Sequence, residues 1–208
     1  MISGIICEFN PFHAGHKHLI DQVKCHPGDA VVCVMSGNFV QRGTFAVYDK
    51  RARTETALKG GADLVLELPT AYATRSAEGV ARAGVQLLEA TGVVERLAFG
   101  TECADLQALT ALAGEIKAHQ GEIAQVMKTG CSYPAARRKV IDSPLLDTPN
   151  NILALEYMEC TQLPCTCVQR LGLGHDTADP LYSASAIRAS LPAEAIYSIE
   201  HCQRAVLA

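Results

Sequence analysis

Short apolar runs alternate with longer helical patterns along the first 120 residues of the chain. The apolar runs cover residues 2–7, 30–35, 63–68 and 96–99, and they have the continuous hydrophobicity of strands buried on both faces. The stretches at 17–24, 49–59, 77–90 and 104–117 have helical patterns. Strands separated by helices of this length predict βαβ units and therefore an α/β fold with a doubly wound parallel sheet.

The second half of the chain is less regular. Residues 150–160 and 183–191 are expected to form helices, 166–170 one more strand, and 202–207 the start of a last helix. We find no internal repeat and no low-complexity linker. The sequence therefore predicts one domain over residues 1–208.

The segment that follows the first strand carries the most informative chemistry. A strand that stops at Asn10-Pro11, before a helix near Gly15, leaves helix-initial N–H groups facing solvent. With the positive end of the helix dipole, such groups form a phosphate site. His13 and His16 are three residues apart, so both rings can point to one side. Together with Gly15, which permits close approach to the backbone, they predict a nucleotide site.

Composition narrows the class of protein. With 208 residues and 49% hydrophobic content, the chain can bury a substantial core. No apolar run reaches the roughly 18 residues of a membrane helix, and no secretory signal is present. The nine cysteines are odd in number, which favours reduced thiols in a cytoplasmic protein. Cys160, Cys165 and Cys167 contain no CxxC pair, so we expect no metal site.

The charge gives no support for broad nucleic-acid binding. The chain has 18 Lys and Arg residues against 22 Asp and Glu residues, whereas proteins with many phosphate contacts usually carry a basic surplus. Basic residues do cluster locally, at 50–53 and at 137–139. One or more of Lys50, Arg51 and Arg53 could reach a phosphate, although basic residues on a solvated helix face are the commoner explanation.

Polar residues follow the predicted strands, where ligands bind to such sheets. The loop 36–43 has two glycines around Asn, Gln and Arg, and we expect Ser36, Gly37 and Asn38 to help shape a substrate pocket. Glu67 could hold a metal or substrate, or could simply lie at the sheet edge. Gly100 would let adenine or ribose lie against the backbone.

Two later segments resemble ligand-binding helix starts. One of Asn150 and Asn151 is expected to cap its helix, which leaves the other amide free to read a base or a small carboxylate. In 182–188 (YSASAIR), two hydroxyls, helix-initial N–H groups and Arg188 converge. This arrangement suits a departing pyrophosphate, while an ordinary helix cap with a surface arginine is the simpler alternative.

Taken together, six ordered blocks resemble one family, and they extend over nearly the whole chain: EFNPFHAGHKHLI, SGNFVQRGTFAVYDKRARTETAL, GGADLVLELP, FGTE, PNNILALEY and SASAIR. They are similar to the bacterial tRNA(Met) cytidine acetate ligases of the HIGH nucleotidyltransferase superfamily. The resemblance implies a Rossmann-like fold and a ligase that uses ATP, with Mg²⁺, to activate acetate as acetyl-adenylate. It further implies transfer of acetyl to N4 of the wobble cytidine of elongator tRNA(Met).

The resemblance also implies site residues. His13, His16 and Arg188 would be catalytic, with Arg188, Ser183 and Ser185 steadying the pyrophosphate. The ATP contacts would be Ile5, Ile6, Cys7, Glu8, Phe9, Asn10, Pro11, Phe12, His13, Ala14, Gly15, His16, Lys17, His18, Gly100, Asn151 and Arg170, in addition to Ser183 and Ser185.

One departure from the family pattern keeps alternatives open. Family members continue into a helical C-terminal region that helps hold tRNA, whereas this sequence stops at Ala208. Nucleotide activation should survive such a loss better than tRNA modification. The alternatives are a nucleotidyltransferase acting on another small phosphate or carboxylate, and a non-catalytic nucleotide-binding module.

Overall fold

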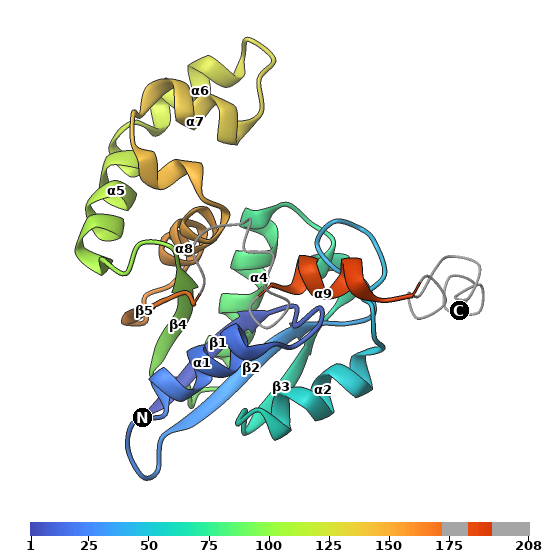
Figure 1. The fold of residues 1–208 in the computed structure, drawn as a ribbon. Coiled ribbons are helices and arrows are strands. Elements are labelled where there is room, and N and C mark those ends of the chain that lie inside the picture. The colour runs from blue at the N-terminus through green and yellow to red at the C-terminus, as the bar shows by residue number, and fades with distance from the viewer. Residues whose placement is uncertain (172–182, 193–208) are drawn as a thin grey trace.

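Five parallel strands form one sheet, in the order β3-β2-β1-β4-β5 (Figure 1). The structure is a computed structural model that describes residues 1–171 and 183–192, so Tyr182 and the helix expected at 202–207 lie outside the described residues. The strands are β1 (Ile2–Cys7), β2 (Ala30–Ser36), β3 (Leu64–Leu68), β4 (Arg96–Thr101) and β5 (Cys165–Gln169). The predicted α/β fold with a parallel sheet is confirmed.

The order of the strands places a ligand crevice at the end of β1. The chain builds outward from β1 to β2 and β3, then returns to place β4 on the other side of β1. Ile2 to Cys7 of β1 pair in register with Ala30 to Met35 of β2. The point where the strand order reverses, beyond the carboxyl ends of β1 and β4, is where open α/β sheets bind ligands.

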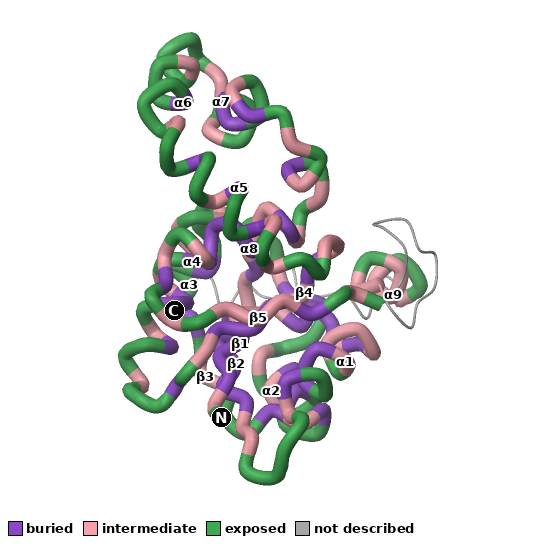
Figure 2. Tube along the Cα trace, turned by 90° about the vertical axis from the view of Figure 1, so that its left-hand side faces the viewer, coloured by how far each residue is buried: buried purple, intermediate pink, exposed green. Residues whose placement is uncertain are grey.

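Helices cover both faces of the sheet, as the edge-on view in Figure 2 shows. On one face lie α1 (Ala14–Val23) and α2 (Lys50–Lys59), and on the other α4 (Ala77–Ala90) and α8 (Pro149–Cys160). In β2, Val31, Cys33 and Met35 pack against α1 and α2, whereas Val32 and Val34 pack toward α4 and α8. Because residues 31–35 of this strand all meet a core, this part of its sequence is apolar without alternation.

A helical extension projects beyond α8 and the end of β4 (Figure 1). It consists of α5 (Leu106–Ala118), α6 (Gln120–Met127), α7 (Tyr133–Val140) and the 3₁₀ turn η1 (Pro144–Asp147). Arg137 of α7 is 1% exposed and forms a 3.0 Å ion pair with Glu156 of α8. The basic run at 137–139 is therefore not one surface patch, because its first member holds α7 against α8.

The structure corrects several predicted boundaries. The first helix begins at Ala14 rather than residue 17, and α8 begins at Pro149 with Thr148 as its N-cap. The helix expected at 183–191 is α9 (Ala184–Ser190). It lies near the carboxyl edge of the sheet, as does one further short helix, α3 (Thr70–Ala73). The sequence pattern did not predict α3, α6, α7 or η1. Within the described residues, the helices are all too short or too polar to span a membrane.

Candidate active site

The turn from β1 into α1 is closed by its two histidines. His13 is the N-cap of α1, and its Nδ1 accepts a hydrogen bond from the Gly15 N–H at 3.0 Å. In return, the His13 N–H donates to Nδ1 of His16 at 3.3 Å. The rings stack with centroids 3.7 Å apart. This reciprocal pair is a capping box built from imidazoles instead of the usual hydroxyl and carboxylate.

The capping box corrects one part of the sequence interpretation. The N–H groups of Gly15, His16 and Lys17 were expected to face solvent, but Gly15 donates to His13 Nδ1, and the other two donate to the His13 carbonyl. Phosphate donors at this turn must therefore come mainly from side chains.

Both imidazoles are neutral near pH 7. Burial, reinforced by Arg170 and Arg188, lowers the pKa of His13 to about 4. Burial together with His13 and Arg170 holds the pKa of His16 well below its ordinary value. A neutral ring has one N–H, and Nδ1 of each ring is already an acceptor, so the proton of each lies on Nε2. The turn therefore fixes the tautomer of both histidines.

An unusual backbone conformation at Phe9 supports this turn. Phe9 has a φ of 46°, in the left-handed region that bulky residues rarely adopt. Its buried ring packs edge-on against Phe12, at 5.0 Å between centroids, and lies 4.8 Å from the His16 ring. These contacts hold the strained residue in place and support the His16 ring from behind.

Arg53 joins the ends of β1 and β2 and does not reach a phosphate. Its side chain is 1% exposed, and its guanidinium donates to the carbonyls of Glu8, Ser36, Gly37 and Tyr48. The interpretation of Arg53 as a candidate phosphate ligand is therefore wrong. A signal was present in the sequence, because Arg53 shares a helix face with the buried Ala57, one turn later.

The neighbouring basic residues on α2 have other surroundings. Lys50 forms a 2.7 Å ion pair with Glu67 at the sheet edge, and Arg51 is exposed. Glu67 is thus paired with a lysine, which agrees with its interpretation as an edge residue.

A second polar cluster lies beyond β4. Asn151, which is 2% exposed, accepts hydrogen bonds at Oδ1 from the N–H groups of Glu102 and Cys103, both at 3.1 Å. The Glu102 carboxylate accepts from the Asn151 N–H and from the Asn150 amide. Arg170 donates to the Asn150 oxygen at 3.3 Å. Neither asparagine caps α8, so that expectation is wrong; together they anchor the loop after β4 and position Arg170.

Helix α9 is fastened to the first turn from 178 residues away. Arg188 donates to the Asn10 carbonyl at 2.5 Å and to Oγ of Ser185 at 3.0 Å. Ser183 is the N-cap of α9 and accepts from the Ala186 N–H at 3.3 Å. The two serines are therefore engaged within α9, while Arg188 reaches the β1–α1 turn.

These elements surround a cleft of about 360 Å³ at the carboxyl edge of the sheet. Most of the predicted contacts line it: Ile5, Ile6, Cys7, Glu8, Phe9, Asn10, Gly15, His16, His18, Gly100, Arg170 and Arg188. Other predicted residues are not among those that line it: Pro11, Phe12, His13, Ala14, Lys17, Asn151, Ser183 and Ser185. Residues that the sequence did not single out, among them Tyr157, Leu153 and Val80, also line the cleft.

Comparison with known proteins assigns the fold to a family. A family model described as HIGH Nucleotidyl Transferase matches residues 1–206. The chain belongs to this family. It is 43% identical over 215 residues to the tRNA(Met) cytidine acetate ligase of Syntrophomonas wolfei subsp. wolfei, an alignment that covers 91% of this chain and 51% of the relative. The ligase of the same name from Clostridium perfringens (strain SM101 / Type A) is 40% identical, with 91% and 54% covered.

Two solved structures of Thermotoga maritima TmcAL have the same architecture. The apo form aligns with a TM-score of 0.79 at 32% identity, covering 99% of this chain and 57% of that one. The form bound with alpha-thio ATP aligns with a TM-score of 0.77 at 33% identity, covering 99% and 56%. The resemblance predicted from the six sequence blocks is confirmed. The chain spans about half the length of the curated relatives it matches.

A pair of substitutions separates the capping role of the histidines from any role in the cleft. Asn is a good N-cap and Gln suits the third position of a capping box, so the double variant His13→Asn/His16→Gln should keep both hydrogen bonds. Its unfolding free energy should stay within about 0.5 kcal/mol of wild type in urea titrations. His16→Ala should lose roughly 0.5–1.5 kcal/mol, because the His13 N–H loses its acceptor. Equal losses in the two proteins would contradict the capping box.

The arginine that joins β1 and β2 gives a second test. Arg53→Met should lower the unfolding free energy by at least about 2 kcal/mol, because it leaves several buried carbonyls without a donor. Arg51→Met, on the exposed side of the same helix, is the matched control and should change it by no more than about 0.5 kcal/mol. Comparable effects of the two substitutions would show that Arg53 does not hold the strands together.

The low pKa of His13 predicts a pH-dependent stability. The unfolded chain takes up a proton at the ordinary histidine value of 6.5, whereas the folded chain does so at about 4. The stability that depends on keeping this ring neutral is therefore fully present above pH 6.5 and is lost as the pH falls from 6.5 toward 4. Between pH 7 and 4.5, wild type should lose more stability than His13→Asn, as measured by urea midpoints. Parallel pH profiles would refute the buried neutral ring.

Proposed function

We propose that this chain uses ATP to activate acetate as acetyl-adenylate, from which acetyl passes to N4 of the wobble cytidine of elongator tRNA(Met). The observation that carries the proposal is the cleft at the end of β1, where His16 meets Arg170 and Arg188. One neutral N–H donor and two guanidinium groups around one cleft suit a triphosphate. The names of the relatives support the choice of acetate and tRNA(Met).

The geometry suits ATP as the nucleotide. Gly100 lines the cleft, and because it has no side chain, a flat ring can approach its backbone closely. We place adenine or ribose against Gly100, with Asn151 holding that loop from behind. The likeness to a structure bound with alpha-thio ATP supports the same assignment.

Each polar group then has a defined task. The Nε2–H of His16 donates to a phosphate oxygen as negative charge grows at the α-phosphorus. His13 holds His16 in the correct tautomer and orientation through its N–H, which donates to Nδ1 of His16. Arg188 and Arg170 stabilise the departing pyrophosphate. Ser185 accepts from Arg188 and Ser183 caps its helix, so the two serines position this arginine.

The proposal includes Mg²⁺, which would bind together with the nucleotide. Over residues 1–171 and 183–192, no three His, Cys, Asp or Glu side chains are grouped closely enough to hold a metal ion. We therefore propose that Mg²⁺ is held mainly by the phosphate oxygens of ATP, where it would neutralise part of their charge.

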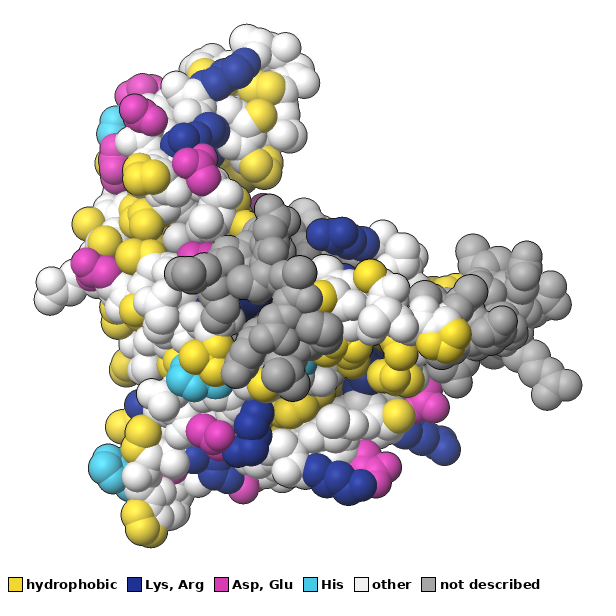
Figure 3. Space-filling model, viewed as in Figure 1, with side chains coloured by type: hydrophobic (Ala, Val, Ile, Leu, Met, Phe, Trp, Pro, Cys, Tyr) yellow, Lys and Arg dark blue, Asp and Glu magenta, His cyan; other side chains and the backbone are white. Residues whose placement is uncertain are grey.

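The tRNA step places further demands on the protein. In the view of Figure 3, the Lys and Arg side chains of the described residues are dispersed among Asp and Glu, without one dominant basic patch. We propose that residues 1–208 form the catalytic unit that activates acetate in the cytoplasm. Efficient transfer to tRNA(Met) would then use surfaces equivalent to those in the part of the relatives that the alignment with this chain does not cover.

Exchange of labelled pyrophosphate into ATP tests the activation step. Exchange should require acetate, and it should fall by roughly 10²–10³-fold in the His13→Asn/His16→Gln variant, because the cleft loses the positioned imidazole donor of His16 while the turn remains capped. Mass analysis of tRNA(Met) for acetylcytidine then tests the transfer step.

Different outcomes distinguish the alternatives. Exchange that needs another carboxylate or a phosphate compound, and ignores acetate, would reassign the substrate. Nucleotide binding without exchange under any condition would identify a binding module. Full exchange in the double variant would move the catalytic role away from the histidines.

A further inference from the structure

The cleft has two halves that differ in chemistry. His16, Leu19 and Val168 line it from the side of the sheet covered by α1, together with Gly100 and the two arginines. On the opposite side, covered by α4 and α8, the lining is Leu68, Ala73, Val80, Phe99, Leu153 and Tyr157. The cleft therefore passes over the carboxyl edge of the sheet, and its second half is almost entirely apolar.

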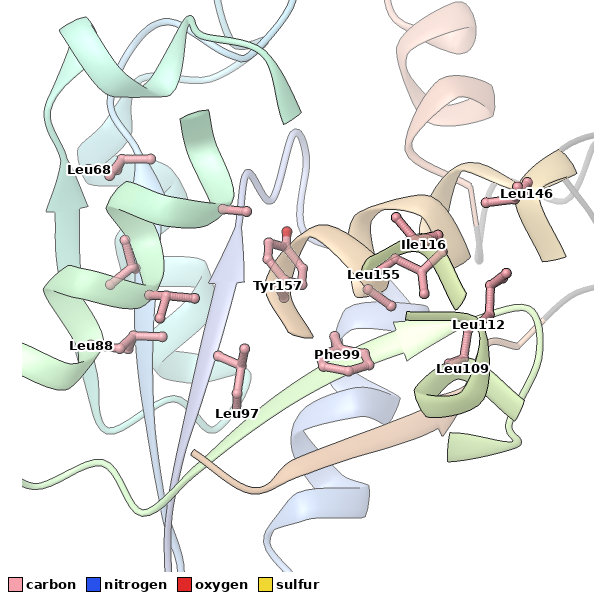
Figure 4. Close-up of a cluster of buried hydrophobic side chains, with 14 of the residues drawn as sticks. Leu68, Leu88, Leu97, Phe99, Leu109, Leu112, Ile116, Leu146, Leu155 and Tyr157 are labelled. Atoms are coloured by element: carbon pink, nitrogen blue, oxygen red, sulfur yellow. The ribbon is translucent and has the colours of Figure 1, made fainter. Parts of the chain in front are cut away.

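Two hydroxyl groups interrupt this apolar lining. Ser36, at the end of β2, is 3% exposed, and its Oγ has no hydrogen-bond partner within the described residues. Tyr157 of α8 is 8% exposed and lines the cleft as well. Figure 4 shows its ring between Leu68 and Phe99, with the hydroxyl directed away from Phe99. A buried hydroxyl without a partner costs free energy, which a ligand in the cleft can recover.

The Tyr157 hydroxyl is a hydrogen-bond donor in this position. Burial, with the nearby Cys7 and Glu8, raises the pKa of Tyr157, so the phenol keeps its proton. Glu8 also lines the cleft, and its carboxylate accepts from the Gln41 N–H at 2.8 Å. The Glu8 charge favours an orientation in which the reacting oxygen of a carboxylate points toward His16 and Arg188, and the apolar tail points away from them.

We propose that the half of the cleft lined by Val80, Leu153 and Tyr157 is the acyl subsite, which takes a short unbranched carboxylate. The methyl group lies against Val80 and Leu153, and the Tyr157 and Ser36 hydroxyls donate to the carboxylate oxygen that does not react. This inference rests on the proposed function, because it names the place of the acid that the nucleotide activates.

The placement accounts for the reaction without a proton transfer. The free carboxylate oxygen forms a bond to the α-phosphorus, and the bond from that phosphorus to the oxygen bridging it to the β-phosphorus breaks. The electron pair leaves with pyrophosphate toward Arg188 and Arg170. Since acetate is already an anion, no base is required, and the tyrosine stays protonated throughout.

Acetate-dependent pyrophosphate exchange by this chain tests the subsite. Tyr157→Phe removes one oxygen and keeps the ring, so the KM for acetate should rise about 5- to 10-fold while the KM for ATP stays within about twofold, as expected for one hydrogen bond. Tyr133→Phe is the matched control: Tyr133 lies on α7, away from the cleft, where its hydroxyl accepts from Gln120. It should leave both KM values unchanged.

The preference for the length of the carboxylic acid substrate tests the subsite independently. Val80→Ala should raise the ratio of kcat/KM for propionate over that for acetate about tenfold, because the smaller side chain enlarges the subsite by the volume of a methylene group or more. Val93→Ala, at an exposed position, should leave the ratio at its wild-type value. Thermal unfolding of each variant confirms that the fold is intact.

The possible failures are distinguishable. If wild-type exchange depends on acetate but Tyr157→Phe and Val80→Ala change neither the KM for acetate nor the length preference, the subsite is wrong and the proposed function stands. If Tyr157→Phe raises the KM for ATP instead, the hydroxyl serves the nucleotide and the subsite is again wrong. If no carboxylate supports exchange in wild type, the proposed function and the subsite both fail.

Discussion

The pair of hydrogen bonds between His13, His16 and the backbone of their own turn is the constraint on which the candidate site depends. Each ring uses Nδ1 to close the start of α1. Because burial keeps both rings neutral, each then has one remaining N–H, at Nε2. The same bonds that begin a helix therefore also determine which atom can meet a substrate. A protonated histidine at either position would lose its acceptor and open the turn.

Around this turn, the structure connects segments that lie far apart in the sequence. Arg53 brings the ends of β1 and β2 together through four carbonyl groups, and Arg188 attaches α9 to Asn10. Asn151 does the same for the loop after β4. In each case a polar side chain bonds mainly to backbone groups just beyond strand ends, which regular sheet pairing leaves without partners. The cleft is therefore built by polar contacts on a hydrophobic scaffold.

The sequence predicted the fold well because one physical signal dominates it. Strands covered on both faces are apolar throughout, so β1, β2 and β4 were found with boundaries within two residues, and α4 without error. Helices α6 and α7 were not predicted, because each has only eight residues and buries only one or two of them. Residues 133–140 contain three consecutive basic residues, which conceal the buried Arg137.

The sequence predicted which segments meet at the candidate site better than it predicted the contacts of each residue. The motif around His13 and His16 and the SASAIR block mark segments that the structure does bring together. The sequence analysis did not identify the hydrogen-bond partner of each group: the capping roles of the histidines, the engagement of both asparagines, and the carbonyl groups to which Arg53 donates. The partners of the asparagines and of Arg53 depend on distances across the sheet, which no local pattern encodes. The sequence analysis did not single out Tyr157, because its position is that of an ordinary aromatic residue in a helix.

The most direct test of this account is the ¹⁵N chemical shifts of the His13 and His16 rings at pH 7, measured in labelled protein. The account predicts a neutral ring at both positions, with the hydrogen on Nε2 and a bare Nδ1 that shows the shift of a hydrogen-bond acceptor. A protonated imidazolium, or a hydrogen on Nδ1 of either ring, would contradict it.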